Sequence, residues 1–429
     1  MTASAIRSLR SGQRSLEHWL QHLERIHPRT IAMGLERVSQ VRQSMGLNPK
    51  FPIITVAGTN GKGSACAMLE AIFHAAGYRV GIYTSPHLLQ YNERVRVGRH
   101  NVTDAALCAA FQQVEQARGD TLLTYFEFGT LAAMQVLIER QVEVAILEVG
   151  LGGRLDAVNV FDPLCALIMS IDIDHQDYLG LTRESIGREK AGILRAGKSA
   201  VCADPDPPLS VIEHARILQV PLKISGRDFH FSADKQQWQW SSAAVKRAGL
   251  PLPALRGSYQ VANAAACLAL LDEVREQLPV DMGAIRRGLL DIDLAGRFQL
   301  LPGRPQVILD VAHNPHAARG LRASLQAMPR SGKVRAVFAM LRDKDMVGTA
   351  RELKDEIDQW HVSGIATARG ASAEEIRGAL RSAEVTAPVI EYADPAAAYR
   401  AAVSGAGQDD RILVFGSFHT VAAVRRQTK

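Results

Sequence analysis

The chain has 429 residues, more than one ordinary core accommodates, so we expect two or three domains. Its content of 47% hydrophobic and 22% charged residues is typical of a soluble globular protein, and no apolar run is long enough for a membrane span. The net charge of +6 is mild and the basic residues are dispersed, which argues against a nucleic-acid partner. Five scattered cysteines without metal-type spacing predict a reducing, cytoplasmic environment.

The first informative feature along the chain is a glycine-rich turn that follows an apolar strand. The turn reads Gly58-Thr59-Asn60-Gly61-Lys62-Gly63-Ser64. Glycines let backbone N–H groups curl around an anion, the lysine adds charge, and the serine offers a hydroxyl to a phosphate or its Mg²⁺. The strict phosphate-loop pattern would place a glycine at Val56 and a Ser or Thr at Gly63. The sequence therefore predicts a compressed triphosphate site, in preference to a plain strand-to-helix turn.

Strands and helices alternate from Phe51 onward, which predicts a parallel sheet with helices on both faces. We expect strands at Ile53–Val56, Val80–Tyr83, Val144–Val149, Ala166–Ile171 and Ala200–Cys202. The expected helices are Gly63–Ala76, Asp104–Arg118, Phe126–Arg140, Arg183–Leu194 and Leu209–Leu218. Aromatic residues alternate on either side of a polar turn between Phe229 and Trp240, which predicts an antiparallel flap on the sheet edge.

A second α/β pattern begins near residue 296. Its expected strands are Val307–Val311, Val334–Met340, Gln359–Val362, Val389–Tyr392 and Ile412–Phe415. Its expected helices are His316–Ala327, Met346–Glu356, Ala373–Ser382, Pro395–Val403 and Thr420–Arg426. The fold class is therefore predicted as α/β: a parallel-sheet ATPase domain with a small flap at 1–295, and a doubly wound, Rossmann-like domain at 296–429. Ligands are expected where two such domains meet.

Polar residues that follow the expected strands are candidates for the site. Glu148 ends an apolar strand just before a glycine-rich loop, where Mg²⁺ needs oxygen ligands, so we favour metal binding over a local ion pair. His175 stands among three aspartates at the same predicted edge, and its spacing leaves a metal ligand and a structural histidine equally open. Ser85 could cap the next segment or offer its hydroxyl to a metal, and its spacing favours the cap; Lys190 has the pattern of a helical lysine that faces solvent.

In the second domain, two polar turns follow expected strands. Asp310–His316 precedes one helix and Gly416–His419 precedes another. They indicate either a site at the sheet edge or two helix caps, since Asn314-Pro315 is also a good helix start.

These segments and their order resemble the folylpolyglutamate synthases of the Mur ligase superfamily, from about Trp19 to Val424. The segments are Gly58–Ser64, Thr84–Leu88, Leu147–Asp156, Arg188–Ile193 and Asp310–Pro315. Thr30–Val38 and Leu123–Thr130 resemble the members that act on both dihydropteroate and reduced folates. The resemblance implies an ATP-dependent amide ligase, expected to be a monomer. It would join L-glutamate to dihydropteroate, making dihydrofolate, and to reduced folates, making folylpolyglutamates.

The resemblance also implies roles for individual residues. ATP would contact Thr59, Asn60, Gly61, Lys62, Gly63, Ser64, Asn263, Arg297 and Asp310. Two Mg²⁺ sites would use Ser85, Glu148, His175 and Lys190. The pterin would lie against Thr30, Ile31, Ala32, Met33, Thr124, Tyr125, Phe126 and Glu127, with Arg154, Leu155 and Asp156 nearby. The expected catalytic residues are Lys62, Lys190, His313 and Ser417, the last two close to the incoming glutamate and the γ-phosphate.

Lys190 and Ala32 are the two positions where the resemblance changes or departs from the expected pattern. The family carries the lysine that matches Lys190 as an N-carboxylated side chain, and a carbamate anion can bind a metal that a lysine cation would repel. This implication reverses the interpretation from spacing alone. Ala32 stands where relatives often have Asp, so the pterin contact differs there.

The implied chemistry is activation of a carboxylate. Transfer of the γ-phosphoryl group would give an acyl phosphate, which the amine of L-glutamate attacks. Lys62, Mg²⁺ and the loop N–H groups would stabilise charge at phosphorus. Closure of the second domain would bring His313 and Ser417 in and keep water away.

Three alternatives remain. The chain could be a folylpolyglutamate synthase only, or a nucleotide-binding switch without ligase activity, although a switch needs neither the second metal-ligand set nor a second α/β domain. A cell-wall peptide ligase of the same superfamily would carry a sugar-nucleotide domain before the phosphate loop, and the 57 residues before Gly58 are expected to be too few for one.

Overall fold

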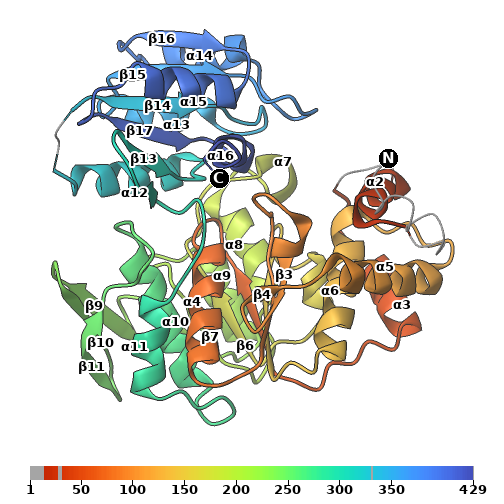
Figure 1. The fold of residues 1–429 in the computed structure, drawn as a ribbon. Helices are drawn as coiled ribbons and strands as arrows, with labels where there is room; N and C mark the ends of the chain where they lie inside the picture. The colour runs from red at the N-terminus through yellow and green to blue at the C-terminus, as the bar shows by residue number, and fades with distance from the viewer. Residues whose placement is uncertain (1–13, 28–30, 330–331, 429) are drawn as a thin grey trace. The chain divides into compact units, whose positions relative to one another are not determined.

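The computed structural model describes residues 14–27, 31–329 and 332–428, which form two compact units (Figure 1). Unit 1 comprises the described residues of Met1–Ile171, Thr182–Pro251 and Ala264–Asp291. Unit 2 comprises those of Asp172–Leu181, Leu252–Asn263 and Ile292–Lys429. Two short pieces of chain that lie between elements of unit 1 in the sequence thus belong to unit 2.

Unit 1 is built on an eight-stranded sheet of order β4-β3-β2-β5-β1-β6-β7-β8. Its parallel strands are β1 Ile53–Ala57, β2 Val80–Tyr83, β5 Val144–Glu148, β6 Cys165–Ile168, β7 Ala200–Cys202 and β8 Leu222–Ile224. The short strands β3 (Val95–Val97) and β4 (His100–Asn101) add an antiparallel edge. The central strands β1 and β5 are apolar and fully buried because helices cover both faces of the sheet. The predicted parallel sheet is confirmed.

The helices of unit 1 include the five that were predicted, together with helices at 36–44 and 282–290 that were not. They are α2 Leu16–Ile26, α3 Glu36–Ser44, α4 Lys62–Ala75, α5 Asp104–Arg118, α6 Tyr125–Glu139, α8 Arg183–Ala191, α9 Leu209–Ile217 and α11 Met282–Leu290. Helix α10 (Gln260–Glu273) begins in unit 2 and continues in unit 1. The sequence pattern did not predict α10, whose buried stretch Ala264–Leu271 is apolar on every side and has no helical period.

The flap is a separate antiparallel sheet, not an extension of the main sheet edge as predicted. Its order is β11-β10-β9, with β9 at Phe229–Ala233, β10 at Gln237–Ser242 and an unpredicted third strand β11 at Lys246–Pro251. The Trp240 indole donates to the Ala265 carbonyl at 3.0 Å, and Arg247 pairs with Asp272. Side-chain contacts with α10 therefore hold the flap.

Unit 2 contains a six-stranded sheet of order β12-β13-β17-β14-β15-β16. Its strands are β12 Gln299–Leu301, β13 Gln306–Leu309, β14 Val334–Phe338, β15 Gln359–Ser363, β16 Val389–Tyr392 and β17 Arg411–Phe415. All pairs are parallel except β12 with β13. Its helices are α7 Gln176–Leu179, α12 Pro315–Gln326, α13 Met346–Leu353, α14 Ala373–Ser382, α15 Pro395–Ser404 and α16 Phe418–Arg425. The predicted doubly wound pattern is confirmed.

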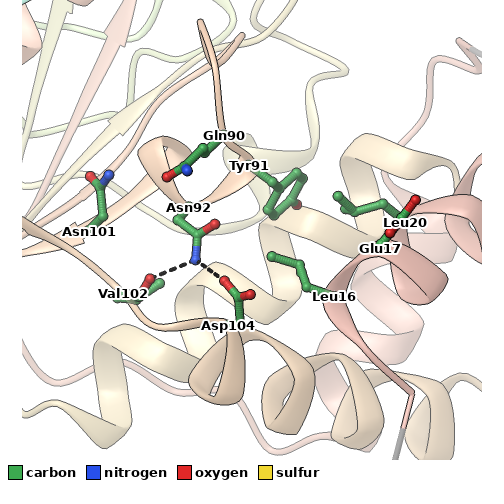
Figure 2. Close-up of a pocket in the computed structure, with 9 residues that line it drawn as sticks. All are labelled: Leu16, Glu17, Leu20, Gln90, Tyr91, Asn92, Asn101, Val102 and Asp104. Atoms are coloured by element: carbon green, nitrogen blue, oxygen red, sulfur yellow. Dashed lines mark hydrogen bonds between the residues drawn. The ribbon is translucent and has the colours of Figure 1, made fainter. Parts of the chain in front are cut away.

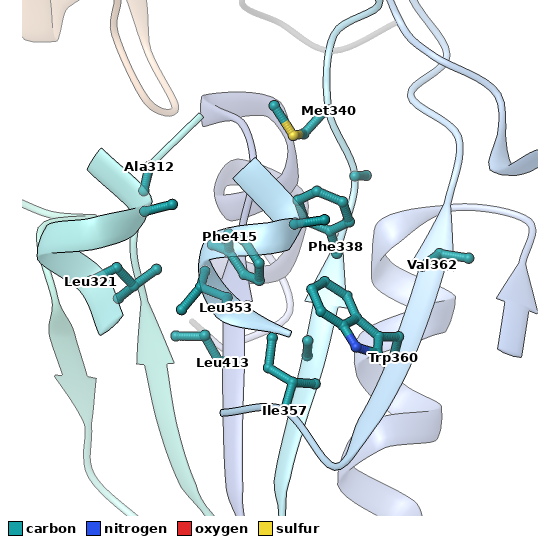
Figure 3. Packing of buried hydrophobic residues seen from close by; sticks show 14 of the residues in the cluster. Ala312, Leu321, Phe338, Met340, Leu353, Ile357, Trp360, Val362, Leu413 and Phe415 are labelled. Atoms are coloured by element: carbon teal, nitrogen blue, oxygen red, sulfur yellow. The ribbon is translucent and has the colours of Figure 1, made fainter. Parts of the chain in front are cut away.

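The core of unit 2 lies between this sheet and helices α12, α13 and α14 (Figure 3). Phe338 lies 5.3 Å from Trp360 and 4.7 Å from Phe415, measured between ring centroids, and all three are fully buried. This packing fixes the carboxyl ends of β14 and β17, which carry polar turns. In neither unit does any helix among the described residues combine the length and apolarity that crossing a bilayer requires.

Candidate functional site

The glycine-rich turn joins β1 to the 14-residue helix α4. Gly58 and Gly61 have φ values of +148° and +88°, and Gly61 is the N-cap residue of the helix. Gly63 lies inside the first turn of α4, so it does not contribute the backbone curl that was predicted for it. Left-handed backbone at two positions lets the chain curl from the end of β1 into the N-terminus of α4, a geometry that binds phosphate.

Lys62 closes the turn on itself. Its Nζ donates to the carbonyl oxygens of Gly58 at 2.9 Å and Thr59 at 3.2 Å. The other side of the turn rests on the end of β6: the Thr59 N–H donates to Ser170 O at 2.7 Å, and the Ser170 hydroxyl donates to Asn60 O at 3.3 Å. The ammonium group is therefore held at the mouth of the loop, where an incoming phosphate would exchange for the carbonyls.

Glu148 lies at the carboxyl end of β5, beside the phosphate loop on β1. It is 5% exposed, and its Oε2 accepts from the Ser85 N–H at 3.1 Å. Ser85 caps no helix, since Gln90 is the N-cap residue of the next one, η1 (Tyr91–Arg94); the cap that its spacing favoured is therefore wrong. The structure thus brings together two of the four predicted metal ligands.

Lys190 is 3% exposed near the end of α8, so the solvent-facing lysine indicated by spacing alone is wrong. The end of α8 packs on the glycine-rich loop that follows Glu148. A Cβ on Gly153 would lie 2.8 Å from Glu189 O and 3.1 Å from Lys190 Cα, so only glycine fits there. Arg154 N donates to Glu189 O at 2.7 Å. Lys190 is thereby placed against this loop.

Asp156 closes the same loop from within. It is 4% exposed and accepts from the Leu151 N–H at 2.8 Å and the Val158 N–H at 3.1 Å. Burial raises the pKa of its carboxyl to about 7, although these backbone donors favour the ionised form. Its described bonds support the loop and the short helix η2 (Ala157–Val160).

The predicted pterin residues lie around the N-terminus of α6, except Thr30, which is outside the described residues. Thr124 and Glu127 form the capping box of α6 and are almost completely buried. Arg37 of α3 joins the two parts: its guanidinium donates to Glu127 Oε1 at 2.9 Å and to Ala32 O at 2.9 Å. The segment that contains Ile31, Ala32 and Met33 is therefore tied to Glu127.

Aromatic rings form the adjoining wall. Phe126 stacks on Tyr83 at 5.7 Å, and its ring would lie 2.7 Å from a Cβ on Gly150. Tyr125 contacts Tyr91 edge-to-face at 5.9 Å. Gly34 N lies 3.5 Å from Leu155 O, which places Leu155 next to the same segment. Rings and buried polar groups in one wall suit a flat heterocycle.

In unit 2, Asp310 is the centre of a second group. It is 3% exposed and accepts from the N–H groups of Phe298 at 2.8 Å and Ala312 at 2.7 Å, and from the Tyr259 hydroxyl at 3.3 Å. Burial raises its pKa despite these donors. Arg297 lies over the Phe418 ring at 5.1 Å. Asn263, at the start of α10, donates to Gln260 Oε1 at 3.1 Å.

His175 belongs to unit 2, although its sequence position predicts the edge of the first sheet. It caps α7 with φ +52°, and Nζ of Lys344 lies 3.1 Å from its Nε2. The same Nζ contacts Asp174 Oδ1 at 2.5 Å. Burial alone would raise the pKa of Asp174, but the His313 hydrogen bond and the Lys344 charge outweigh it and lower that pKa.

His313 and Ser417 occupy turns at the ends of β13 and β17. Nδ1 of His313 donates to Val311 O at 2.8 Å, which leaves Nε2 facing Asp174 Oδ2 at 3.7 Å. Asn314 and Ser417 are also helix N-caps, so the alternative reading of these turns as caps is confirmed as part of their role. Both turns lie at the carboxyl edge of one parallel sheet, where ligands bind in α/β folds.

A surface pocket of about 610 Å³ lies elsewhere in unit 1, between α2, η1 and the start of α5 (Figure 2). Tyr91 and Asn92 face it from one side, and Leu16 from the other. None of the predicted site residues lines it. This pocket is therefore separate from the phosphate loop.

The residues of the phosphate loop fit a nucleoside triphosphate, and the side chains of Glu148 and Ser85 fit a Mg²⁺ site. The cradle has two left-handed glycines, a lysine ammonium and a long helix behind it. Carboxylate and hydroxyl oxygens are ligands that Mg²⁺ prefers. Within the described ranges, no group of three or more His, Cys, Asp or Glu side chains has a metal-binding arrangement, and the predicted set indeed draws on Ser85 and Lys190 as well.

Three residues with clear contacts to the site were not predicted: Arg37, Tyr259 and Lys344. Each acts through a partner that was predicted, namely Glu127, Asp310 and His175. Arg37 lies inside the segment Thr30–Val38, and Lys344 follows a strand in a charged turn, so their positions in the sequence could have marked both as candidates. The contact of Tyr259 with Asp310 spans 51 residues of sequence and had no local signal.

Comparisons with known proteins match both units. The family model of the Mur ligase middle domain matches residues 56–271, and that of the Mur ligase glutamate ligase domain matches residues 296–418. The chain is 45% identical to the dihydrofolate synthase/folylpolyglutamate synthase of Escherichia coli, covering 95% of this chain and 94% of that protein. It is 40% identical to the Haemophilus influenzae protein of the same name, covering 95% and 96% of the two chains.

Solved structures agree with these matches. E. coli FolC in complex with DHPP and ADP superimposes with a TM-score of 0.92 at 44% identity, covering 97% of this chain and 98% of that one. A bifunctional folylpolyglutamate synthase/dihydrofolate synthase with Mn, AMPPNP and L-glutamate bound gives a TM-score of 0.90 at 46% identity, with the same coverage.

Proposed function

The chain belongs to the Mur ligase family, among its dihydrofolate synthases/folylpolyglutamate synthases, and from this premise we propose how its residues carry out the reaction. The protein is an ATP-dependent ligase that joins L-glutamate to dihydropteroate and to reduced folates. The observation that carries this conclusion is the phosphate cradle beside the buried Glu148–Ser85 pair, in a chain 45% identical to such an enzyme over 95% of its length.

The cradle on α4 activates the acceptor carboxylate. Lys62 gives up its two carbonyl partners to hold the phosphates of ATP, with the loop N–H groups around them. Mg²⁺ on Glu148 and Ser85, when bound, neutralises part of the phosphate charge. The γ-phosphoryl group passes to the acceptor carboxylate, ADP leaves, and the resulting acyl phosphate has a good leaving group. The amine of L-glutamate then attacks the carbonyl carbon, phosphate departs, and the amine loses a proton.

We assign the pterin of the acceptor to the wall made by Ala32, Glu127 and the aromatic residues Tyr125 and Phe126. Support comes from the Arg37 bridge, which ties Ala32 to Glu127. The predicted contacts at Thr30, Ile31, Met33, Thr124, Arg154, Leu155 and Asp156 remain part of this proposal. Asp156 acts by supporting the loop at Leu151, and Thr124 acts by capping the N-terminus of α6.

Lys190 is proposed to carry CO₂ as a carbamate that completes the metal ligands of unit 1. Its burial supports this role, because a carbamate shielded from water is protected from loss of CO₂. The carbamate would supply oxygens in place of a cation next to Mg²⁺. His175 is the fourth proposed ligand, and the second Mg²⁺ site rests on the same set.

In unit 2 we assign Arg297, Asp310 and Asn263 to the ribose, phosphate and adenine of ATP, and His313 and Ser417 to L-glutamate and the γ-phosphate. The hydrogen bond from Nδ1 of His313 to Val311 O supports this assignment, since it fixes the ring in the turn that follows β13, with Nε2 beside Asp174. We further propose that residues 1–295 form the ATP-binding catalytic domain and 296–429 the glutamate-ligase domain. Action as a cytoplasmic monomer completes the proposal, and the five free cysteines fit a reducing compartment.

A paired ligation assay tests the function. Phosphate release is expected to require ATP, Mg²⁺, L-glutamate and an acceptor together, with dihydropteroate and tetrahydrofolate both serving. Product masses should increase by one glutamyl residue per ADP formed. Activity with tetrahydrofolate but not with dihydropteroate would show that the protein is a folylpolyglutamate synthase only. Phosphate release that does not depend on acceptor and glutamate would contradict the ligase function.

A further inference from the structure

Arg94 is a buried cation that no carboxylate of the described chain balances. It ends η1 and is 9% exposed. Its Nε donates to Nδ1 of His87 at 2.9 Å, and among the described residues this is the guanidinium's only hydrogen bond. The residues outside the description include no Asp or Glu. Burying a guanidinium without an anion costs folding free energy. This cost suggests that Arg94 pairs with an anion from outside the chain.

Two tyrosine rings hold the guanidinium in place. Its Cζ lies 5.2 Å from the ring centroid of Tyr91 and 5.4 Å from that of Tyr125. The rings attract the cation but accept none of its N–H groups in line. The two terminal nitrogens of Arg94 make no hydrogen bond within the described chain, and they are not fully buried. A ligand can therefore reach them from outside. The result is a rigid fork of donors with a free edge.

The position of Arg94 connects the two ends of the acceptor site. Tyr125 belongs to the proposed pterin wall. On the other side, Thr84 N donates to Arg94 O at 2.9 Å, and the next residue, Ser85, bonds Glu148. An acceptor that reaches from the pterin wall to the phosphorylated carboxylate therefore passes Arg94.

We propose that Arg94 binds the α-carboxylate of the glutamyl tail of a folate acceptor. This inference rests on the proposed function and concerns the carboxylate that a folate has and dihydropteroate lacks. Dihydropteroate has a single carboxylate, which is the one that reacts. A folate has a second carboxylate on the same glutamyl residue, which stays ionised during the reaction and matches the free edge of the guanidinium. Arg94 thus serves the addition of the second and later glutamates.

Pteroate and pteroylglutamate test this assignment, because they differ only by the glutamyl group. Binding of each to the full-length protein with MgADP is measured by calorimetry for the native chain, Arg94→Gln, Arg94→Lys and Arg140→Gln. Arg140 is exposed at the far end of α6 and controls for loss of one positive charge. We expect Arg94→Gln to weaken pteroylglutamate binding by roughly 10- to 100-fold, the worth of a charge-assisted pair, and to leave pteroate within about twofold.

Steady-state kinetics give an independent readout. Arg94→Gln should raise KM for tetrahydrofolate by a similar factor, with KM for dihydropteroate and for ATP unchanged. Arg94→Lys keeps the charge without the fork and should lie between the native chain and Arg94→Gln; it also carries the test if the Gln variant does not fold. Equal losses for both acceptors, or none for either, would overturn the assignment. If the native chain ligates neither acceptor, the proposed function itself has failed.

Discussion

Several charged side chains of this chain are buried at strand ends or in the turns that follow them, and Lys190 is buried near the end of α8. Glu148, Lys190, Asp310 and Lys344 are each at most 9% exposed. Folding alone gives no reason to bury such groups, because removing a charge from water is expensive unless partners compensate. Three of them end or follow strands at the carboxyl edges of two sheets, where ligands bind in α/β folds, and burial raises the pKa of Asp310 and lowers that of Lys344.

The buried amine of Lys190 is proposed to carry CO₂, and its removal tests that proposal. Replacing it with Ala removes the amine that would carry CO₂, and we expect kcat to fall by roughly 100-fold or more, the scale of losing one group that stabilises the transition state. Bicarbonate with a short-chain carboxylic acid should restore part of the activity, because a free carboxylate can occupy the place of the carbamate. The phosphate-release assay measures both effects.

Lys198→Ala is the matched control, since that lysine is exposed seven residues after the end of α8. It should keep native turnover. Normal turnover in Lys190→Ala would refute the carbamate. An intact-mass measurement under native conditions, with and without ¹³C-labelled bicarbonate, follows the modification apart from activity.

At the scale of elements, the phosphate loop depends on close packing between β1 and β6. A Cβ on Gly58 would lie 2.6 Å from Cβ of Met169, at a φ that L-residues rarely adopt. In a variant with a Cβ at this position, the loop and the end of β6 would have to move apart. That movement would break the hydrogen bond from Thr59 N–H to Ser170 O, which holds them together in the native chain. The loop's shape is therefore set by its neighbour as much as by its own glycines.

Gly58→Ala is expected to weaken binding of an ATP analogue about tenfold or more and to cost about 1–3 kcal/mol of unfolding free energy. Gly46→Ala separates strain from crowding, because Gly46 has φ +65° but a Cβ added there would meet no atom within 4 Å. It should lose about 1 kcal/mol and bind the analogue normally. Calorimetry and urea unfolding measure the pair. Equal nucleotide affinity in both variants would show that the contact with Met169 is unimportant.

The Asp156 loop predicts a pH dependence of stability. An unfolded carboxyl titrates near 3.8, whereas Asp156 in the folded chain titrates near 7 because it is buried. Between these values the folded state binds the proton that the unfolded state releases, so the unfolding free energy falls as pH rises. The contribution, up to about 4 kcal/mol, is complete below pH 4 and lost by pH 7.

Asp156→Asn should remove this slope, although it also loses one backbone acceptor and is less stable overall. Urea unfolding of both proteins between pH 4.5 and 7.5 gives the difference. Parallel stability curves would show that Asp156 is already ionised in the folded chain.

The sequence predicted most elements with local periodic patterns, to within a few residues at their ends. Helix α10 was missed because burial on every side leaves no helical period. Strand β11 was missed because its sequence Lys-Arg-Ala-Gly-Leu-Pro has no regular alternation of apolar and polar residues, and it pairs only with β10. The environments of Lys190 and Arg94 were also beyond local patterns. Each is decided by a distant segment: Lys190 by the loop at Gly153, and Arg94 by Tyr125 of α6.

At the scale of the whole molecule, unit 2 depends on two pieces of chain that precede it by a long way. Asp172–Leu181 supplies Asp174 to Lys344, and Leu252–Asn263 supplies Tyr259 to Asp310 and Ser258 to Ser324. The sheet of unit 2 and its hydrophobic core are complete without them. These pieces instead supply partners to polar groups of unit 2, two of which, Asp310 and Lys344, follow strands β13 and β14.

A fragment of residues 292–429 is therefore expected to fold with lower stability than unit 2 has in the full chain. Trp360 is the only tryptophan of unit 2 among the four in the chain, so its fluorescence reports this unit once Trp19, Trp238 and Trp240 are replaced by Phe. We expect the urea midpoint of the fragment to be lower because Asp310 and Lys344 lose their partners. The same midpoint in fragment and full chain would contradict this dependence.

Because the chain passes from unit 1 to unit 2 and back twice before it stays in unit 2, no single cut separates the two. A chimaera made by joining the first 291 residues of this chain to the last part of a relative would pair Asp174 and Tyr259 of one parent with Lys344 and Asp310 positions of the other. Exchange of the glutamate-ligase part between relatives therefore has to move three segments at once. Recombination at a single point would lower the stability of unit 2, because its polar contacts would join residues of two parents even though both hydrophobic cores remain whole. The two parts of the chain are therefore expected to evolve together.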